Sequence, residues 1–289
     1  MQAPQSLDAL VQHIQSRYKD MSPQFQIGAR YLIDHPTQVS ILSMRKIATL
    51  AGVQPATLVR LAQHLGYDGW EPLKSVFNRQ LRMLPGGYAD RAQALVADSQ
   101  EAESADWVRS TQAQSANLLA LGAANAQAMP DAIERLHRAR RLHIAGFRSS
   151  HPAAFSLKYL CSLFRPDVYL LDNAAGTLDQ DLRHLGSEDT LVIISFAPYS
   201  REVRQITEAA RRQGCPIIAL CDSRLAPVAI EAACVLTFTT HSGSFFPSTV
   251  AAQGLVEVLA QQLLVRAGAR AVQGLARAEA QLHESGAYL

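Results

Sequence analysis

The chain has little of what metal centres and disulfide frameworks require. Its 289 residues include four cysteines, Cys161, Cys215, Cys221 and Cys234, at spacings that fit neither a zinc module nor a dense disulfide framework. The nine histidines show no paired-ligand pattern such as HExxH. We therefore expect reduced cysteines in a protein core, no metal site, and no cofactor.

Long apolar runs are also missing. No stretch approaches the about 18 residues of a membrane span, and the start, MQAPQSLDALVQHIQSRYKD, turns polar too early for a signal peptide. These absences favour a soluble, cytoplasmic protein with no membrane partner. With 48% hydrophobic and 18% charged residues, the chain is long enough for two domains with separate cores, which excludes a disordered or fibrous protein.

Charge of either sign is nearly balanced, at a net +2, but it is unevenly placed. Residues 1–85 hold nine Lys/Arg and five Asp/Glu, whereas the remainder holds eighteen and twenty. A basic N-terminal part permits a nucleic-acid partner. Chance variation between two surfaces explains an asymmetry of this size equally well.

Turn signals divide the N-terminal part into short helices. The apolar spacing over 23–33 predicts a helix, which the following Asp-His-Pro ends. Ser43 is a plausible N-cap for a second helix that stops at Gly52, and Pro55 suits the first turn of a third, which closes at Gly66. Two short helices joined by a tight turn predict a helix-turn-helix.

The C-terminal part alternates between β-rich and helical runs. From residue 141, the runs RLHIAG, DVYLL, TLVIISF, PIIALC and ACVLTF are separated by helical stretches, and a long apolar helix follows over about 248–265. This alternation predicts a doubly wound α/β domain with a five-stranded parallel sheet, whose ligands bind outside the carboxyl ends of the strands.

A connecting region separates the two parts. Pro85-Gly86-Gly87 is expected to be the linker, and two Ala-rich helical stretches follow it. Flexible polar segments are the alternative for this region. We predict a DNA-binding domain over 1–84, connecting helices over 85–129 and an α/β domain over 130–289.

Within the helix-turn-helix, apolar and polar residues separate. The residues expected to pack the two helices together are Ile47, Ala48, Ala51, Val53, Leu58, Val59 and Leu61. Gln54, Thr57 and Arg60 are left to face a major groove, where Gln and Arg have defined base partners. Arg45, Lys46 and Lys74 are suited to phosphates of double-stranded operator DNA.

The stretch SMRKIATLAGVQPATLVRLAQHLGYDGWEPLK resembles the N-terminal module of RpiR-type transcriptional regulators, through its AGV turn, ATxVR run and LGYxGxxxLK close. The resemblance covers roughly residues 5–82. It implies an N-terminal domain that binds DNA. Gln54 stands where that family usually has a serine as recognition-helix N-cap.

Two loops after predicted strands carry small residues and hydroxyls, which leave backbone N–H groups open to an anion. One is Gly146-Phe147-Arg148-Ser149-Ser150, and the other runs from Ser195 through Tyr199 to Ser200. They resemble the GxGxS and SxSGxT loops of the sugar-isomerase (SIS) domain, which hold phosphosugars. That resemblance implies ligand contacts from Ser150, Ser195 and Ser200, with Ser149 adjacent.

The loops also depart from the SIS pattern. Arg148 replaces a glycine, while Ala197 and Pro198 replace a serine and a glycine. A lost hydroxyl and a gained arginine favour another anion, such as a carboxylated metabolite bound through Arg148. The alternative for Arg148 is an ion pair at the surface or an interface. The effector-binding prediction comprises Gly146, Arg148, Ser149, Ser150, Ser195, Tyr199 and Ser200.

Two further interpretations concern the same domain. Asp167 lies 21 residues after Gly146, which is the spacing of a dinucleotide site; the single glycine and Arg148 argue against one. The HSGSFFPS segment, 241–248, either lines the pocket, from its own or a neighbouring subunit, or is a loop that caps the last helix at Ser248.

The two resemblances together imply a transcriptional regulator, in most such proteins a repressor, of a carbohydrate or related catabolic operon. A phosphosugar or sugar acid would be the small anionic effector, and the protein would be a homodimer or homotetramer. The alternative is a phosphosugar isomerase, since SIS domains also occur in enzymes. Glu202, His151 and His184 are the conceivable bases, but none lies in a motif for proton transfer. We therefore expect no catalytic residues and no enzyme.

Overall fold

The computed structural model describes residues 3–4, 7–83, 87–99, 105–224 and 226–287. It divides into two compact units, residues 1–103 and 104–289. The division falls inside the predicted connecting region 85–129; of the predicted linker, Pro85 and Gly86 lie outside the described residues. Within the described part of the chain, no helix combines the length and apolarity needed to cross a membrane.

The first unit is helical, as predicted. Its helices are α1 (Leu7–Arg17), α2 (Pro23–Asp34), α3 (Pro36–Ile41), α4 (Met44–Ala51), α5 (Pro55–His64), α6 (Trp70–Met83) and α7 (Tyr88–Ser99). Its core includes Leu10 of α1, Leu32 of α2, Ile47 of α4, Leu61 of α5 and Phe77 of α6, all essentially inaccessible to solvent. Because each helix contributes one apolar stripe to this core, the helix-turn-helix is held by α1, α2 and α6.

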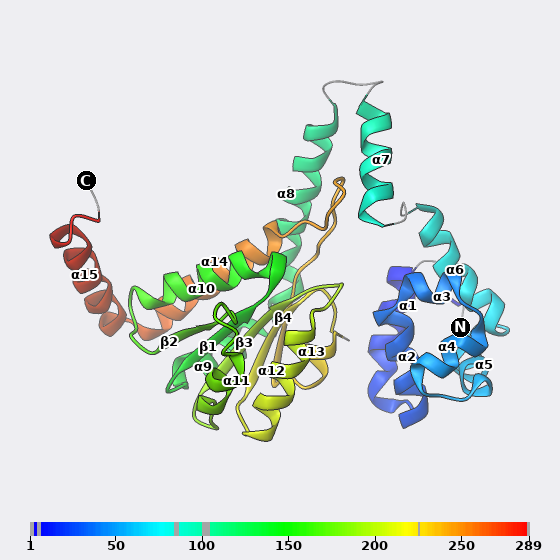
Figure 1. The fold of residues 1–289 in the computed structure, drawn as a ribbon, viewed down its shortest axis with the longest axis horizontal. Coiled ribbons are helices and arrows are strands. Elements are labelled where there is room, and N and C mark those ends of the chain that lie inside the picture. The colour runs from blue at the N-terminus through cyan, green and yellow to red at the C-terminus, as the bar shows by residue number, and fades with distance from the viewer. Residues whose placement is uncertain (1–2, 5–6, 84–86, 100–104, 225, 288–289) are drawn as a thin grey trace. The chain divides into compact units, whose positions relative to one another are not determined.

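The second unit contains a five-stranded parallel sheet in the order β2-β1-β3-β4-β5 (Figure 1), which confirms the predicted doubly wound fold. The strands are β1 (Leu142–Gly146), β2 (Val168–Leu171), β3 (Thr190–Ser195), β4 (Ile217–Cys221) and β5 (Cys234–Thr237). The chain passes from β1 outward to β2 and then returns to the other side of β1 to form β3. The topological switch point, where ligands bind in such sheets, is therefore at the carboxyl ends of β1 and β3.

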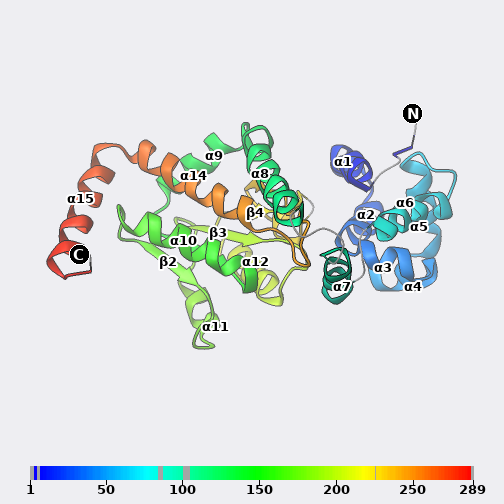
Figure 2. The ribbon, with the colours of Figure 1, turned by 90° about the horizontal axis from the view of Figure 1, so that it is seen from above.

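Helices cover both faces of the sheet (Figures 1 and 2). The helices are α8 (Ala105–Asn125), α9 (Met129–Arg138), α10 (His151–Ser162), α11 (Leu178–Asp181), α12 (Arg201–Arg212), α13 (Pro227–Ile230), α14 (Val250–Ala267) and α15 (Ala269–Glu284). Helices α9, α10 and α14 share one core with the side chains of Ile144 and Ile194. Helices α11, α12 and α13 share the other with those of Ala145 and Ile193. The strands are buried on both faces, as their continuous apolar runs require.

The four cysteines are buried, unpaired residues of this unit, which confirms the prediction made for them. Burial raises the pKa of the Cys161 and Cys221 thiols to about 12 and that of Cys215 and Cys234 to about 11. A thiol with so high a pKa is protonated at neutral pH and is a poor nucleophile and metal ligand.

Candidate functional site

The helix-turn-helix is built from local signals that act as predicted. Ser43 caps α4, since its hydroxyl oxygen accepts a hydrogen bond from the Lys46 backbone N–H at 3.4 Å. Gly52 ends α4 in the left-handed conformation, with φ at +73°. Pro55 starts α5, where a missing N–H costs nothing. Gln54, in the N-cap position of α5, makes no side-chain cap hydrogen bond.

The exposed face of α5 differs from the prediction at one residue. Gln54 and Arg60 are exposed, but Thr57 is only 5% exposed and packs into the core beside Leu58 and Leu61. Thr57 is therefore not placed to contact a base. Gln63, which was not singled out from the sequence, is exposed and lies three residues after Arg60, on the same side of the helix.

The basic residues flanking α5 have different surroundings. Arg45 and Lys46 are exposed in the first turn of α4. Lys74 is half-buried, and its Nζ donates a hydrogen bond to the Leu42 carbonyl oxygen at 2.9 Å, at the C-cap of α3. Lys74 thus stabilises a helix end, while Arg45 and Lys46 are open to solvent.

In the second unit, the structure brings the two predicted effector loops together. Gly146, the last residue of β1, pairs in register with Ile194 of the neighbouring strand β3. The loop 147–150 leaves β1 and leads into α10, with Arg148 at a φ of +53°. The loop 196–200 leaves β3 and leads into α12. Both loops therefore lie at the switch point.

Gly146 serves packing in this site. A Cβ at this position would lie 2.7 Å from the Ser150 carbonyl oxygen and 2.8 Å from the Ala154 Cβ. Because glycine has no Cβ, the Ser150 backbone can pack directly against the end of β1, and this contact fixes the position of Ser150. Ser150 is buried, Ser149 is half-buried and Arg148 is exposed.

The second loop is held by a residue that the sequence did not single out. Asp222 directly follows β4, and its Oδ2 accepts a hydrogen bond from the Ala197 backbone N–H at 3.1 Å. Its Oδ1 accepts a hydrogen bond from the Tyr199 hydroxyl at 2.8 Å. Burial raises the pKa of Asp222, while these two hydrogen bonds act in the opposite direction. An aspartate directly after a neighbouring strand was the signal that could have identified it.

The electrostatics of the two loops are linked through Glu202, in the first turn of α12. The pKa of Glu202 is lowered mainly by its own backbone N–H and by the Ser200 hydroxyl, and further by the Arg148 and Arg201 guanidinium groups. Arg148 of the first loop therefore lies close enough to act on the second loop. An anion bound between the loops would meet Arg148 and the N-terminus of α12, which has no side-chain cap.

The other predicted candidates lie in different places. His184 is exposed at the end of the short 3-10 helix Leu182–His184, which leads to the amino end of β3, opposite the loops. Asp167 precedes β2, and its carbonyl oxygen accepts a hydrogen bond from the Leu142 N–H at the start of β1. It is thus at the wrong edge of the sheet to bind a ribose near Gly146, which contradicts the dinucleotide interpretation.

Two buried asparagines of α8 hold the segment that follows β5. Asn125 pairs with the backbone of Thr237 through both amide atoms, at 2.7 and 2.8 Å. The Asn117 Nδ2 donates to the His241 carbonyl oxygen at 2.7 Å, and its Oδ1 accepts from the Thr239 hydroxyl at 2.9 Å. The 241–248 segment is thereby fastened to α8. At its end, the Ser248 hydroxyl oxygen accepts from the Val250 N–H at 3.4 Å, as expected of a residue near a helix start.

These units define a class of protein: a helix-turn-helix DNA-binding unit joined to a sugar-isomerase-type α/β unit. Comparison with protein families agrees with this assignment, because residues 9–82 match the helix-turn-helix domain of the rpiR family and residues 135–266 match the SIS domain. The chain belongs to the RpiR family of transcriptional regulators.

Named relatives are consistent with this assignment. The chain is 25% identical to the HTH-type transcriptional regulator HexR of Pseudomonas aeruginosa over 219 residues, which cover 73% of this chain and 72% of HexR. It is 22% identical to an HTH-type transcriptional regulator of Caldanaerobacter subterraneus over 247 residues, or 82% of each chain. Both relatives are thus named as helix-turn-helix transcriptional regulators.

Solved structures show the same fold. The sugar isomerase domain of an RpiR transcription factor from Sphaerobacter thermophilus matches with a TM-score of 0.57 and 25% identity, covering 60% of this chain and 97% of that chain. The Vibrio vulnificus NanR protein, complexed with ManNAc-6P, matches with a TM-score of 0.57 and 18% identity, covering 96% of this chain and all of NanR.

Proposed function

We propose that this regulator represses a carbohydrate or related catabolic operon and responds to a small anionic effector, a phosphosugar or a sugar acid. The observation that carries the proposal is the adjacency of the loops after β1 and β3 at the switch point of the sheet, on a chain that also has a helix-turn-helix. A regulator works where its operator is, so we place it in the cytoplasm.

The effector site is proposed to lie between the two loops. Ser150, Ser195 and Ser200 supply hydroxyls, and Arg148 supplies the positive charge. A guanidinium forms paired hydrogen bonds with phosphate or carboxylate oxygens, so Arg148 suits either effector class. Asp222 contributes by holding the loop through Ala197 and Tyr199. NanR, a protein of the same fold, is complexed with ManNAc-6P, which supports a phosphosugar.

We propose that the SIS unit senses its ligand without catalysing a reaction on it. Aldose–ketose isomerisation requires a positioned general base. Of the three candidates, His184 lies before the amino end of β3, whereas the effector loops lie at the carboxyl ends of the strands. Glu202 and His151 lie in the first turns of the helices that follow the two loops. The surroundings of Glu202 stabilise its ionised form, which weakens it as a base.

The DNA contacts are proposed to come from the exposed residues of α4 and α5. Gln54, Arg60 and Gln63 are placed to contact base edges, while Arg45 and Lys46 contact phosphates. Helix-turn-helix dimers bind two half-sites that lie one helical turn of DNA, roughly 34–36 Å, apart. We therefore propose a homodimer, or a homotetramer built from dimers, in which effector binding changes the spacing of the two α5 helices.

Helix α8 offers a route between the two functions. It opens the second unit, and Asn117 and Asn125 fasten it to the backbone after β5. A ligand that shifts the 238–249 segment would therefore act on the helix that leads back toward the DNA-binding unit. We expect the Asn117→Ala protein to bind the effector as before. The bound effector should, however, change the DNA affinity of this variant much less than that of the natural protein. Gln114→Ala, on the exposed side of α8, is the matched control.

The test uses a DNA duplex that the full-length protein selects from a random pool. Fluorescence anisotropy then measures affinity for that duplex with and without phosphosugars and sugar acids. We expect one class to change the affinity, and Ser195→Ala–Ser200→Ala to abolish the change. The control is the double variant Ser162→Ala–Ser285→Ala. It also removes two hydroxyls, but these donate to the carbonyl oxygens of Lys158 and Leu282, which lie four and three residues earlier in the chain. A serine-loop variant that responds normally would overturn the effector site, and a protein that selects no sequence would overturn the regulator.

A further inference from the structure

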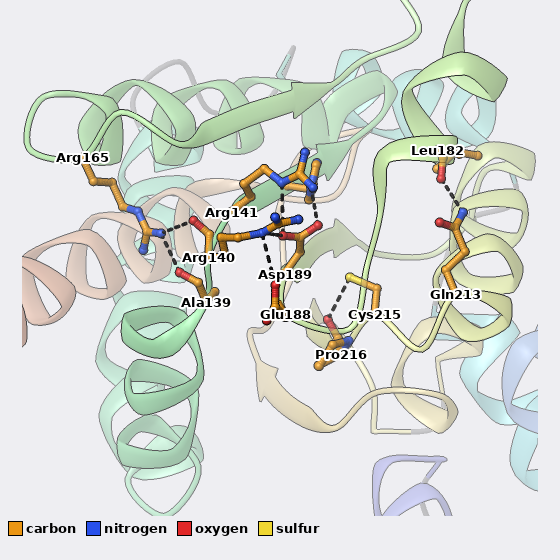
Figure 3. A network of polar contacts seen from close by, with 11 residues as sticks. Ala139, Arg140, Arg141, Arg165, Leu182, Glu188, Asp189, Gln213, Cys215 and Pro216 are labelled. Carbon is orange, nitrogen blue, oxygen red and sulfur yellow. Dashed lines mark hydrogen bonds and ion pairs between the residues drawn. The ribbon is translucent and has the colours of Figure 1, made fainter.

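The amino edge of the sheet, opposite the effector loops, carries a dense group of arginines (Figure 3). Arg141 Nε donates a hydrogen bond to Asp189 Oδ1 at 3.2 Å, and Arg140 Nε lies 3.5 Å from the same oxygen. Arg140 also lies 3.6 Å from Glu188. These two arginines therefore have carboxylate partners, and the carboxylate of Asp189 is fully buried between them and the strands.

A separate cavity beside this group has an excess of positive charge. Its volume is about 390 Å³, and it lies where α9, α10 and α14 end and α15 begins. The ionisable residues that line it are His137, Arg140, Arg165, Arg270, Arg277 and Asp167. Asp167 is the one acid among these lining residues. Because Arg140 is already paired with Glu188 and Asp189, the other three arginines face a single carboxylate.

Arg165 is fixed in the wall of the cavity. Its Nη1 donates to the Leu136 carbonyl oxygen and its Nη2 to the Ala139 carbonyl oxygen, both at 2.9 Å, at the end of α9. Figure 3 shows its side chain reaching toward Ala139 and Arg140. Carbonyl oxygens orient a guanidinium without cancelling its charge. Burial lowers the pKa of Arg165, and so does the neighbouring charge of Arg270, while Cys161 and Asp167 act in the opposite direction.

Helix α15 supplies two further arginines to the same cavity. Arg270, Gly274 and Arg277 are spaced by four and three residues, so they share one face of the helix. A Cβ on Gly274 would lie 2.6 Å from the Phe164 carbonyl oxygen, which shows that this face packs directly against the chain next to Arg165. Arg270 and Arg277 form no ion pair with any described residue.

We propose that this cavity binds a small oxyanion with two or more charges, at a site distinct from the effector loops. Guanidinium groups from α15 and from the end of α10 converge there with too few carboxylates to balance them. Phosphate and carboxylate oxygens are the partners that arginine forks bind most strongly. The bound anion would join α15 to the ends of α9 and α10, and thus fix the C-terminal helix.

The test uses the full-length protein at constant ionic strength, with inorganic pyrophosphate and citrate as separate probes. Isothermal titration calorimetry measures binding, and the melting temperature reports stabilisation by mass action. We expect at least one probe to bind and to raise the melting temperature. Pyrophosphate binding alone would assign a phosphate ligand, and citrate binding alone a polycarboxylate. Binding of neither probe overturns the proposal.

Variants locate the bound anion. We expect Arg270→Ala–Arg277→Ala, and equally the length-conserving Arg270→Gln–Arg277→Gln, to weaken binding at least tenfold with unchanged helix content. Arg211→Ala–Arg212→Ala removes the same charge from the exposed end of α12 and should leave binding unchanged. Equal loss in that control would show non-specific charge attraction, and loss in Arg148→Ala would place the anion in the effector loops. Either result overturns the proposal.

Discussion

The Tyr199 hydroxyl donates a hydrogen bond to Asp222 at 2.8 Å and ties the loop after β3 to the end of β4. The other carboxylate oxygen accepts the Ala197 N–H, so both halves of this loop depend on one side chain. Ser195 and Ser200 lie at the two ends of the same loop. The positions of the two proposed effector hydroxyls therefore depend on a carboxylate that need not touch the effector.

Asp222→Asn tests this relationship through its pH dependence. The folded-state pKa of Asp222 is raised by burial, so the group contributes stability below its unfolded pKa of about 3.9 and loses that contribution as pH rises through the folded pKa. An asparagine does not titrate. We expect the variant to gain free energy of unfolding relative to the natural protein as pH rises from about 4 to 7. Urea denaturation across this range measures the difference in unfolding free energy between the variant and the natural protein. A difference that does not change with pH would contradict a raised pKa for Asp222.

Gly146→Ala tests the tight packing beneath the first loop. The added methyl group would meet the Ser150 carbonyl oxygen and the Ala154 Cβ at under 3 Å, and we expect a loss of about 1–3 kcal/mol in unfolding free energy. Gly122→Ala, in α8, is the control, because nothing lies within 4 Å of its new Cβ. It should stabilise the unit by up to about 1 kcal/mol.

Thiol labelling in urea measures the stability of the second unit in both glycine variants. All four cysteines are buried in the second unit, so their exposure reports the unfolding of that unit separately from the helix-turn-helix. Equal stabilities for Gly146→Ala and the natural protein would show that Ser150 and α10 shift at little cost, and the packing argument would then fail.

Features that depend on neighbouring residues in the chain were predictable from the sequence. The Ser43 cap, the Gly52 turn and the five strands each depend on a few adjacent residues or on one apolar run. The alternation of strands with helices predicted a parallel, doubly wound sheet, whereas the strand order, which places the two loops together, came from the structure. The family comparison confirmed the resulting fold.

Features that depend on tertiary contacts were not predicted. The importance of Asp222 depends on Ala197 and Tyr199, which are more than twenty residues away. Asn125 meets Thr237 across 112 residues, and no local pattern signals that pair. Thr57 is different, because it lies four residues before buried Leu61, and this helical spacing already favoured the core.

The two sides of α5 should respond differently to substitution. Arg60→Ala and Gln63→Ala remove exposed side chains, and we expect each to weaken operator binding by about 1–3 kcal/mol with little change in melting temperature. Thr57→Ala, in the core, should lower the melting temperature and leave the operator affinity of the folded protein unchanged. Anisotropy titrations and thermal unfolding of the same samples decide the matter. A Thr57→Ala variant with full stability but weak DNA binding would return Thr57 to the base-contacting face.

A buried histidine gives the second unit a pH-dependent stability. His143 of β1 is 3% exposed, its Nε2 lies 3.5 Å from Asp189 Oδ2, and its ring stacks on Tyr169 with centroids 5.5 Å apart. Burial lowers the pKa of His143, and the Asp189 carboxylate offsets part of that effect, while Arg141 and His184 lower the pKa further. The folded state therefore holds this ring neutral over a range in which the unfolded chain binds a proton.

The sign of the pH effect follows from this depressed pKa. Stability from His143 is present above its unfolded pKa of about 6.5 and is lost as pH falls through the lower folded value. We expect the unfolding free energy to fall below about pH 6.5, and His143→Phe, which keeps a ring against Tyr169, to reduce that dependence. Urea denaturation at several pH values measures the slope, with His241→Gln as the control because that histidine is exposed. If His143→Phe and the control keep the same slope as the natural protein, other groups cause the loss of stability in acid.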